Sequence, residues 1–226
     1  MSAPDAQSSM TPEHSGAARI TGTLHQKLVY SRRVRVLSAH LSAMIPPNAR
    51  VLDIGCGDGT IDRVILDRRP DISIEGVDVL VRPQTQIPVH TFDGSTLPFP
   101  SASFDLVMFV DVLHHTTDPR VLLREAVRVA GAVLIKDHFR EGFLAGPTLR
   151  FMDWVGNAHH GVALPYNYWS ESQWNAAFRD LHWKMEETRK PDDLYPAPAS
   201  WLFGRDLHFI ARLRHEPASA APARSN

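Results

Sequence analysis

A glycine-rich turn follows a short apolar run in the stretch Val51-Leu52-Asp53-Ile54-Gly55-Cys56-Gly57-Asp58-Gly59. Beyond the turn, apolar residues recur at helical spacing over residues 61–66. The pattern predicts a strand, a tight loop and a helix, because glycine has no Cβ and tolerates the positive φ of a sharp turn. In an open α/β sheet such a loop lies at the carboxyl edge of the strand, where ligands bind.

This loop lacks the features of the common phosphate-binding loops. A Walker loop requires Lys followed by Ser or Thr, and the stretch contains no such pair. The glycine spacing is G-x-G-x-G, whereas the dinucleotide fingerprint is G-x-G-x-x-G. Asp53 stands two residues before the first glycine, where its charge would repel a pyrophosphate and attract a cationic ligand.

The stretch resembles motif I of the class I S-adenosylmethionine-dependent methyltransferases, VLDxGCGxG, in the manner of the type 11 members. Leu97–Pro100 and Ser103–Val110 are similar to the approach to strand four in the same family. The resemblance is close over about residues 50–133. It implies an α/β fold with a Rossmann-like, doubly wound sheet of seven mostly parallel strands, an antiparallel last strand, and helices on both faces. It also implies S-adenosyl-L-methionine as the cofactor.

The expected elements follow from periodicity and from the breaks at proline and glycine. A helix over residues 23–44 is expected before the sheet, with Arg32, Arg33 and Arg35 either on a solvated face or at the substrate side. The short segment Val79–Gln86 abbreviates the crossover that follows the second strand. Strands are expected at residues 51–54, 72–77, 89–92, 104–110, 132–135, 183–188 and 207–213, and helices at residues 60–69, after Asp118, and from Ser170 to Asp180.

Acids at successive strand tips are the candidate cofactor contacts. Asp78 ends the second strand, where a carboxylate can accept both ribose hydroxyls of an adenosine; the alternative is an ordinary loop acid. The resemblance implies that Asp93 contacts the adenine amine and Gly94 the ring, or else the two form a simple Asp-Gly turn. The cofactor-binding residues expected are Asp53, Gly55, Cys56, Gly57, Gly59, Asp78, Val79, Asp93, Gly94, Val110 and Asp111.

The acceptor side is defined less well, because residues 139–169 match no motif. Aromatic and polar residues alternate there, which favours a pocket wall over a packed aromatic core. The substrate-proximal candidates are His115, His159, Tyr166 and Tyr168. His138 is the candidate general base, oriented by Asp137, because it follows the fifth strand and imidazole titrates near neutrality. A structural role for His138 is the alternative, and no metal site is expected.

Length, charge and cysteine content limit the domain organisation and the partners that we expect. The chain has 226 residues, a net charge of −1 and one cysteine, so no disulfide can form within it. We expect one domain at residues 18–215, with an insertion at 139–169 and disordered tails at 1–17 and 216–226. No secretory signal or membrane span is evident, so a cytoplasmic location is the default. A small-molecule acceptor is favoured over nucleic acid, because no broad basic stripe appears.

The reaction that the resemblance implies is direct displacement at the sulfonium methyl, to an acceptor that the sequence does not name. Two alternatives stay open. The first is a cofactor-binding protein without transferase activity, and the second is a methyltransferase acting on protein or nucleic acid. A dehydrogenase is disfavoured by the glycine spacing. The oligomeric state is not indicated by the sequence.

Overall fold

The computed structural model describes residues 31–141, 145–150, 166–191, 193–195 and 207–216. Residues 31–44 and 145–150 are helical. The other elements are β1 (Arg50–Ile54), α2 (Thr60–Arg68), β2 (Ser73–Asp78), β3 (Val89–Thr91), β4 (Leu106–Val110), the 3-10 turn η1 (Leu113–His115), α3 (Pro119–Val129), β5 (Ala132–His138), α5 (Glu171–Asp180), β6 (Trp183–Arg189) and β7 (His208–His215).

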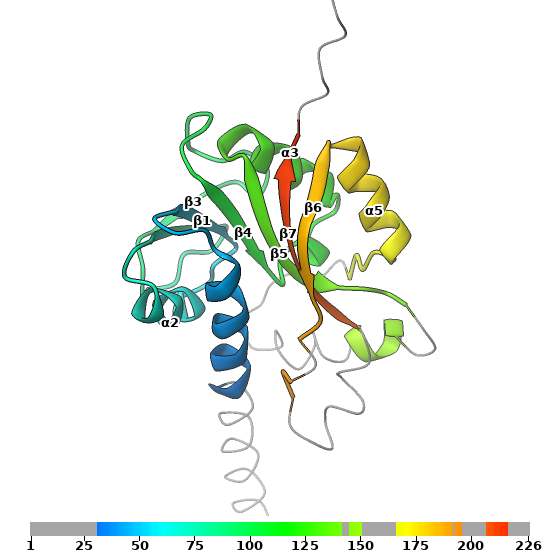
Figure 1. Cartoon of the computed structure of the whole chain (residues 1–226), viewed down its shortest axis with the longest axis horizontal. Helices are drawn as coiled ribbons and strands as arrows, with labels where there is room; N and C mark the ends of the chain where they lie inside the picture. Colours follow the sequence, from blue (N-terminus) through cyan, green and yellow to red (C-terminus); the bar gives the residue numbers. More distant parts are fainter. Residues whose placement is uncertain (1–30, 142–144, 151–165, 192, 196–206, 217–226) are drawn as a thin grey trace, which may run out of the picture.

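The strands form one seven-stranded sheet in the order β3-β2-β1-β4-β5-β7-β6 (Figure 1). The pairs β1–β2, β2–β3, β1–β4 and β4–β5 are parallel. β7 is antiparallel to both of its neighbours, β5 and β6. The predicted α/β fold, with an antiparallel last strand inserted beside β5, is therefore confirmed.

Both faces of the central strands β1, β4 and β5 are buried, as expected for parallel strands covered by helices. Alternate residues of β4 belong to different apolar clusters: Val107 and Phe109 to one, Leu106 and Met108 to the other. The first cluster also contains residues of α3 and α5, and the second contains residues of α2 and of helix 31–44. The helices therefore lie on opposite faces and leave the strand tips available for a site.

The turn after β1 needs glycine for two reasons. Gly55 has a φ of +75°, a conformation that other residues rarely adopt. A Cβ built on Gly55 would lie 2.5 Å from Cγ2 of Val112, so the loop packs closely against the segment after β4. The loop thus joins the two strand tips between which the topology reverses, as the sequence predicts.

Several boundaries differ from the predicted ones. β5 continues to His138, so Lys136, Asp137 and His138 are its last three residues and not a loop beyond it. All three are buried, because β7 pairs with β5 along this whole segment. The predicted strand start at Phe104 is wrong by two residues: Phe104 forms only an isolated bridge with Ala130. The predicted tails, and most of the predicted insertion, lie outside the described residues.

Candidate active site

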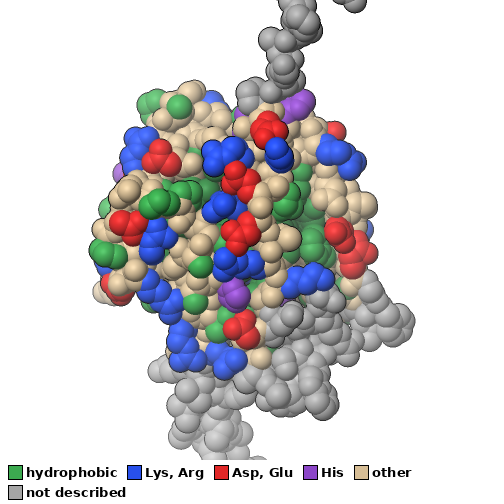
Figure 2. All heavy atoms as spheres, viewed as in Figure 1, with side chains coloured by type: hydrophobic (Ala, Val, Ile, Leu, Met, Phe, Trp, Pro, Cys, Tyr) green, Lys and Arg blue, Asp and Glu red, His purple; other side chains and the backbone are tan. Residues whose placement is uncertain are grey.

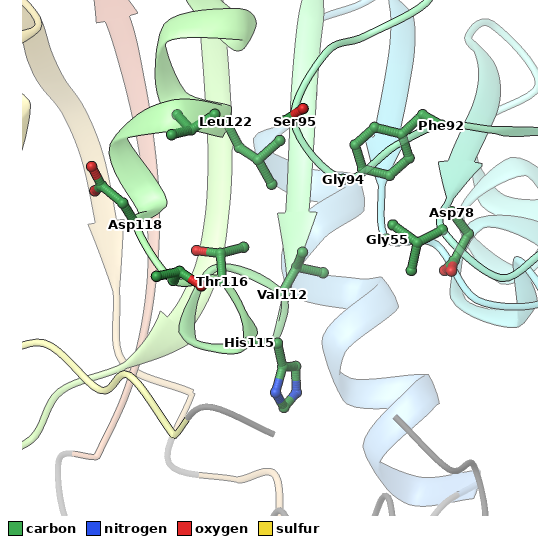
Figure 3. A pocket seen from close by; sticks show the side chains of 13 residues that line it. Gly55, Asp78, Phe92, Gly94, Ser95, Val112, His115, Thr116, Asp118 and Leu122 are labelled. Atoms are coloured by element: carbon green, nitrogen blue, oxygen red, sulfur yellow. The ribbon is translucent and has the colours of Figure 1, made fainter. Parts of the chain in front are cut away.

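A cavity of about 410 Å³ opens at the tips of β1 and β2. Its walls come from the glycine loop, the segment after β3, and the turn that leads into α3. Figure 3 shows Asp78 and Phe92 on one side of this space, and Asp118 and Leu122 on the other. The lining residues are Gly55, Asp78, Val79, Phe92, Gly94, Ser95, Val112, His115, Thr116, Thr117, Asp118, Val121 and Leu122.

Asp78 is held rigidly at the cavity wall. Its Oδ2 accepts a hydrogen bond from the backbone N–H of Gly57 at 2.9 Å, and its Oδ1 accepts one from Leu80 at 2.9 Å. The carboxylate therefore links the tip of β2 to the glycine loop of β1. Each oxygen retains a lone pair that could accept a ligand hydroxyl.

Four of the predicted cofactor residues line the cavity: Gly55, Asp78, Val79 and Gly94. Asp93 does not, because Oδ1 of Asp93 accepts hydrogen bonds from the backbone of Ser95 and Thr96, at 2.7 and 2.6 Å. Those bonds lower the pKa of the Asp93 carboxyl. These hydrogen bonds are those of the Asp-Gly turn, the alternative role predicted for Asp93. The other predicted residues, Asp53, Cys56, Gly57, Gly59, Val110 and Asp111, lie outside the lining set.

The far wall of the cavity was not among the predicted cofactor contacts. Val112, Thr116 and Leu122 reach it because β4 is the neighbour of β1, which places the start of α3 opposite the glycine loop. In the sequence, Asp118-Pro119 marks where α3 begins. Asp118 is the N-cap of α3 and accepts a hydrogen bond from the backbone N–H of Arg120, and Pro119 lies in the first turn.

A second group of polar side chains lies beyond the cavity, at the ends of β4 and β5. We call it the polar cluster; its members are Arg33, Asp111, His114, Lys136, Asp137, His138 and His208. Its centre is Asp111, whose backbone has a φ of +58°. A non-glycine residue in this conformation is strained, and such strain concentrates at functional sites.

Two cations hold Asp111. Nζ of Lys136 and Nη2 of Arg33 each bond a different oxygen of its carboxylate. Burial alone would raise the pKa of Asp111, but Lys136 and Arg33 outweigh burial and keep that pKa well below its usual range. Of the arginines predicted on either a solvated face or the substrate side, Arg33 thus reaches the strand tips.

Lys136 is 1% exposed, and burial lowers the pKa of its ammonium against the opposing effect of Asp111. Its Nζ lies 3.2 Å from Nδ1 of His208. An ammonium can only donate, so Nδ1 of His208 accepts this bond and its ring proton is on Nε2. A series of polar contacts therefore runs from Arg33 in helix 31–44, through Asp111 and Lys136, to His208 in β7.

Asp137 contacts the predicted histidine, His138, and also His114. Oδ1 of Asp137 lies 2.7 Å from Nδ1 of His114 but 3.3 Å from Nδ1 of His138. The same oxygen accepts the backbone N–H of His138 at 2.8 Å. Burial, and then the charge of Lys136, lower the pKa of His138 to about 4. His138 is therefore neutral at neutral pH, with weak driving force as a base.

Ligand-type atoms of His114, Asp137 and His138 all lie within 4.8 Å of one another. Nδ1 of His114 is already hydrogen-bonded to Oδ1 of Asp137. The ammonium of Lys136, on the adjacent residue of β5, would also repel a cation. These three side chains lie close together because Asp137 is hydrogen-bonded to both histidines.

The predicted substrate-proximal residues have different environments. His115 lines the cavity, and its ring lies 4.0 Å from that of His114, centroid to centroid. Tyr168 is buried: it stacks on His114 at 5.1 Å and donates its hydroxyl to the carbonyl of Leu149. Tyr166 is half-buried. His159 lies outside the described residues.

The model of a family described as "Methyltransferase domain" matches residues 25–188, which is most of the chain. This chain belongs to that family. It is 30% identical over 108 residues to 27-O-demethylrifamycin SV methyltransferase of Amycolatopsis mediterranei, covering 41% of this chain and 39% of the relative. It is 27% identical over 139 residues to 2-methyl-6-phytyl-1,4-hydroquinone methyltransferase of Synechocystis, covering 56% and 38%.

The matched segments thus span about two fifths of these relatives. Among solved structures, a SAM-dependent methyltransferase of Thermotoga maritima, titled a possible histamine N-methyltransferase, superposes with a TM-score of 0.58. It is 18% identical, and the superposition covers 87% of this chain and 96% of that one. This likeness supports the methyltransferase fold. Within the described part of the chain, no helix is long and apolar enough to cross a membrane.

Proposed function

We propose that the chain transfers the methyl group of S-adenosylmethionine to a small-molecule acceptor by direct displacement. The observation that carries this proposal is the cavity at the tips of β1 and β2, where the G-x-G-x-G loop meets the fixed carboxylate of Asp78. The family of the chain supports it independently.

The residues present fit this cofactor. Asp78 would accept from the ribose hydroxyls with the lone pairs that its backbone bonds leave over. Phe92 and Leu122 supply apolar walls for an adenine ring, and Gly94 a nearby backbone N–H. Gly55 would allow the amino-acid end to approach the backbone closely, because no Cβ stands in the way. The cavity volume is within the range usual for cofactor sites.

When bound, S-adenosylmethionine supplies a methyl group already activated by its sulfonium. The chain has no need of a nucleophilic residue. Its task is to hold the acceptor in line with the methyl group and to exclude water, and orientation of this kind can contribute about 7–11 kcal/mol. Cys56 is unsuited to nucleophilic attack, because burial and the nearby acids raise the pKa of its thiol.

The acceptor side is the polar cluster together with His115. If the acceptor carries a proton that must leave, His138 with Asp137 is our candidate base, and His114 is the alternative because it makes the shorter bond to Asp137. If His138 is the base, a His138→Ala variant loses most of the methylation rate, with the deficit largest above the pKa of His138, about 4. An unchanged rate across pH would remove His138 from this role.

A small acceptor is favoured by two observations. The two relatives described above are named for small molecules, a rifamycin derivative and a hydroquinone. Figure 2 shows Lys and Arg interleaved with Asp and Glu over the middle of the face in view, and the net charge of −1 gives no general attraction for nucleic acid. An acceptor with an aromatic, apolar or lipid-like body is consistent with both relatives.

The test is transfer of a labelled methyl group from S-adenosylmethionine into an extract of the source organism. The extract is separated into small molecules, protein and nucleic acid before counting. We expect label among the small molecules and much less with an Asp78→Ala variant. Label in protein or nucleic acid would contradict the acceptor class. Cofactor binding without any labelled product would instead support a binding protein without transferase activity.

A further inference from the structure

Asn167 connects two parts of the site that are far apart in the sequence. Its side-chain Nδ2 donates hydrogen bonds to the carbonyls of Thr116 and Thr117, at 3.1 and 3.0 Å. Its backbone N–H donates to the carbonyl of His114 at 3.0 Å. Both side-chain acceptors are carbonyl oxygens, so the amide nitrogen and not the amide oxygen must face them. One residue thus holds the turn formed by residues 114–117, the 114–117 turn, at three points.

The 114–117 turn brings three side chains to the cavity. His115, Thr116 and Thr117 all line it, and Figure 3 shows His115 and Thr116 on the side of this space away from Phe92. Most of the turn lies between regular elements, since η1 ends at His115 and α3 begins at residue 119. The hydrogen bonds from Asn167 therefore supply support that regular secondary structure does not.

Asn167 is itself anchored on the acceptor side of the site. Tyr168, the next residue, is buried and donates its hydroxyl to the carbonyl of Leu149 at 3.1 Å. The carbonyl of Trp169 accepts the backbone N–H of Arg140 at 3.0 Å. Leu149 and Arg140 both belong to the region after β5 that matches no motif. Asn167 therefore ties this region to the wall of the cavity.

The two sides of the cavity depend on different supports. Asp78 is held by the backbone of Gly57 and Leu80, and it lies on the same side as Phe92. Asn167 supports the other side, at His115, where we place the acceptor. Direct displacement is sensitive to alignment, and a misplacement of about 1 Å can cost on the order of 100-fold in rate. A looser 114–117 turn should therefore slow the transfer and leave the binding of adenosine at Asp78 almost unchanged.

We propose that Asn167 is a positioning residue for methyl transfer, which holds the 114–117 turn where His115 aligns the acceptor with the methyl group. This inference rests on the proposed function. The role needs an amide, because one NH2 group carries two protons for two carbonyls. A carboxylate in the same place would set its oxygens against the carbonyl oxygens of Thr116 and Thr117 and repel them.

The test compares the rate of methyl transfer with the affinity for the cofactor in variants of Asn167. The rate is measured with labelled S-adenosylmethionine at saturation and a fixed amount of the small-molecule fraction of the extract. The affinity for S-adenosylmethionine is measured by titration calorimetry. Asn167→Asp has nearly the shape of the wild type but no donor, and Asn167→Gln keeps the donor on a longer side chain. Asn175→Asp is the matched control, because Asn175 is exposed on α5 and the change of charge is the same.

We expect Asn167→Asp to lower the rate by about tenfold or more, and to change the dissociation constant of S-adenosylmethionine by less than about threefold. Asn167→Gln should recover part of the rate, and Asn175→Asp should behave as the wild type. Thermal unfolding shows whether each variant folds. If Asn167→Asp does not, Asn167→Ala takes its place with the same expectation, because it removes the amide without adding a charge.

A rate in Asn167→Asp within about threefold of the wild type overturns the inference and leaves the proposed function standing. A loss of affinity as large as the loss of rate also overturns it, because Asn167 would then support the whole cavity. Equal losses of rate in Asn167→Asp and Asn167→Gln contradict a role for the donated bonds and overturn it too. Absence of methyl transfer by the wild type overturns the proposed function and this inference together.

Discussion

Asp53 in β1 and Asp111 after β4 are buried aspartates at the tips of adjacent strands, yet their environments are opposite. Asp53 faces another acid, Asp62, and its pKa is raised. Asp111 is held by Lys136 and Arg33, and its pKa is lowered. Within the described part of the chain, the charges that act most strongly on Asp53 are those of other acids, whereas the charges of the polar cluster are balanced internally. A cationic ligand suits the first region, and the second can orient an acceptor without adding net charge.

Removing a cation from the balanced region should have the largest effect. Lys136→Met leaves Asp111 buried with Arg33 alone, and breaking a buried ion pair in this way costs about 3–5 kcal/mol of unfolding free energy. Urea unfolding at pH 7 measures this loss. Adding Asp111→Asn to the variant should recover much of the loss. Lys184→Met, which removes an exposed pair with Glu216, is the control and should change little.

Removing the charge of one buried acid near the glycine loop should stabilise the protein. Asp62→Asn removes a carboxyl whose charged form is disfavoured by burial, which raises the pKa of Asp62 to about 6. The sign follows from the raised pKa: the wild type is most stable below pH 3.8 and loses stability as the pH rises through about 6. The advantage of the variant should therefore grow over that interval.

Thermal unfolding from pH 4 to pH 8 checks this, with Asp67→Asn as the exposed control on the same helix. An Asp62→Asn variant that is less stable than the wild type at pH 8 would show that the carboxylate of Asp62 stabilises the fold, contrary to the contrast between the two regions.

Alanine substitutions at Gly55 and Gly57 in the glycine loop should lower the free energy of unfolding by smaller, unequal amounts. Gly57 has a φ of +62° but open space where a Cβ would lie, so Gly57→Ala costs only the conformational penalty of about 1–2 kcal/mol. Gly55→Ala adds a clash with Val112, which should raise the cost by a further 1–3 kcal/mol or so. Denaturant unfolding of both variants measures the difference. Equal losses would mean that Val112 moves aside freely.

The two regions also differ in how far the sequence predicts them. The cofactor half is largely local: strand, glycine turn and helix are consecutive, so spacing alone places Gly55 and Asp78 together. The polar cluster is assembled from segments far apart in the chain. The contact of Arg33 with Asp111 spans 78 residues, and that of Lys136 with His208 spans 72. Neither pairing has a local pattern, because the sheet order creates both.

His114 and Asp62 show the same limit at shorter range. The 3-10 turn at Leu113–His115 directs His114 toward Asp137 in the neighbouring strand, and no local pattern marks this contact. Asp62 looks like an ordinary acid in the first turn of a helix, a favourable place by its charge. Only the packing of α2 on β1 brings it against Asp53.

The central claim is that the cavity at the tips of β1 and β2 binds S-adenosylmethionine through Asp78. Titration calorimetry of the wild type and Asp78→Ala with S-adenosylmethionine, and of the wild type with NAD, tests this claim directly. We predict one binding site for S-adenosylmethionine per chain, at least tenfold weaker binding in Asp78→Ala, and no binding of NAD. Binding of NAD but not of S-adenosylmethionine, or unchanged affinity in Asp78→Ala, would contradict the account.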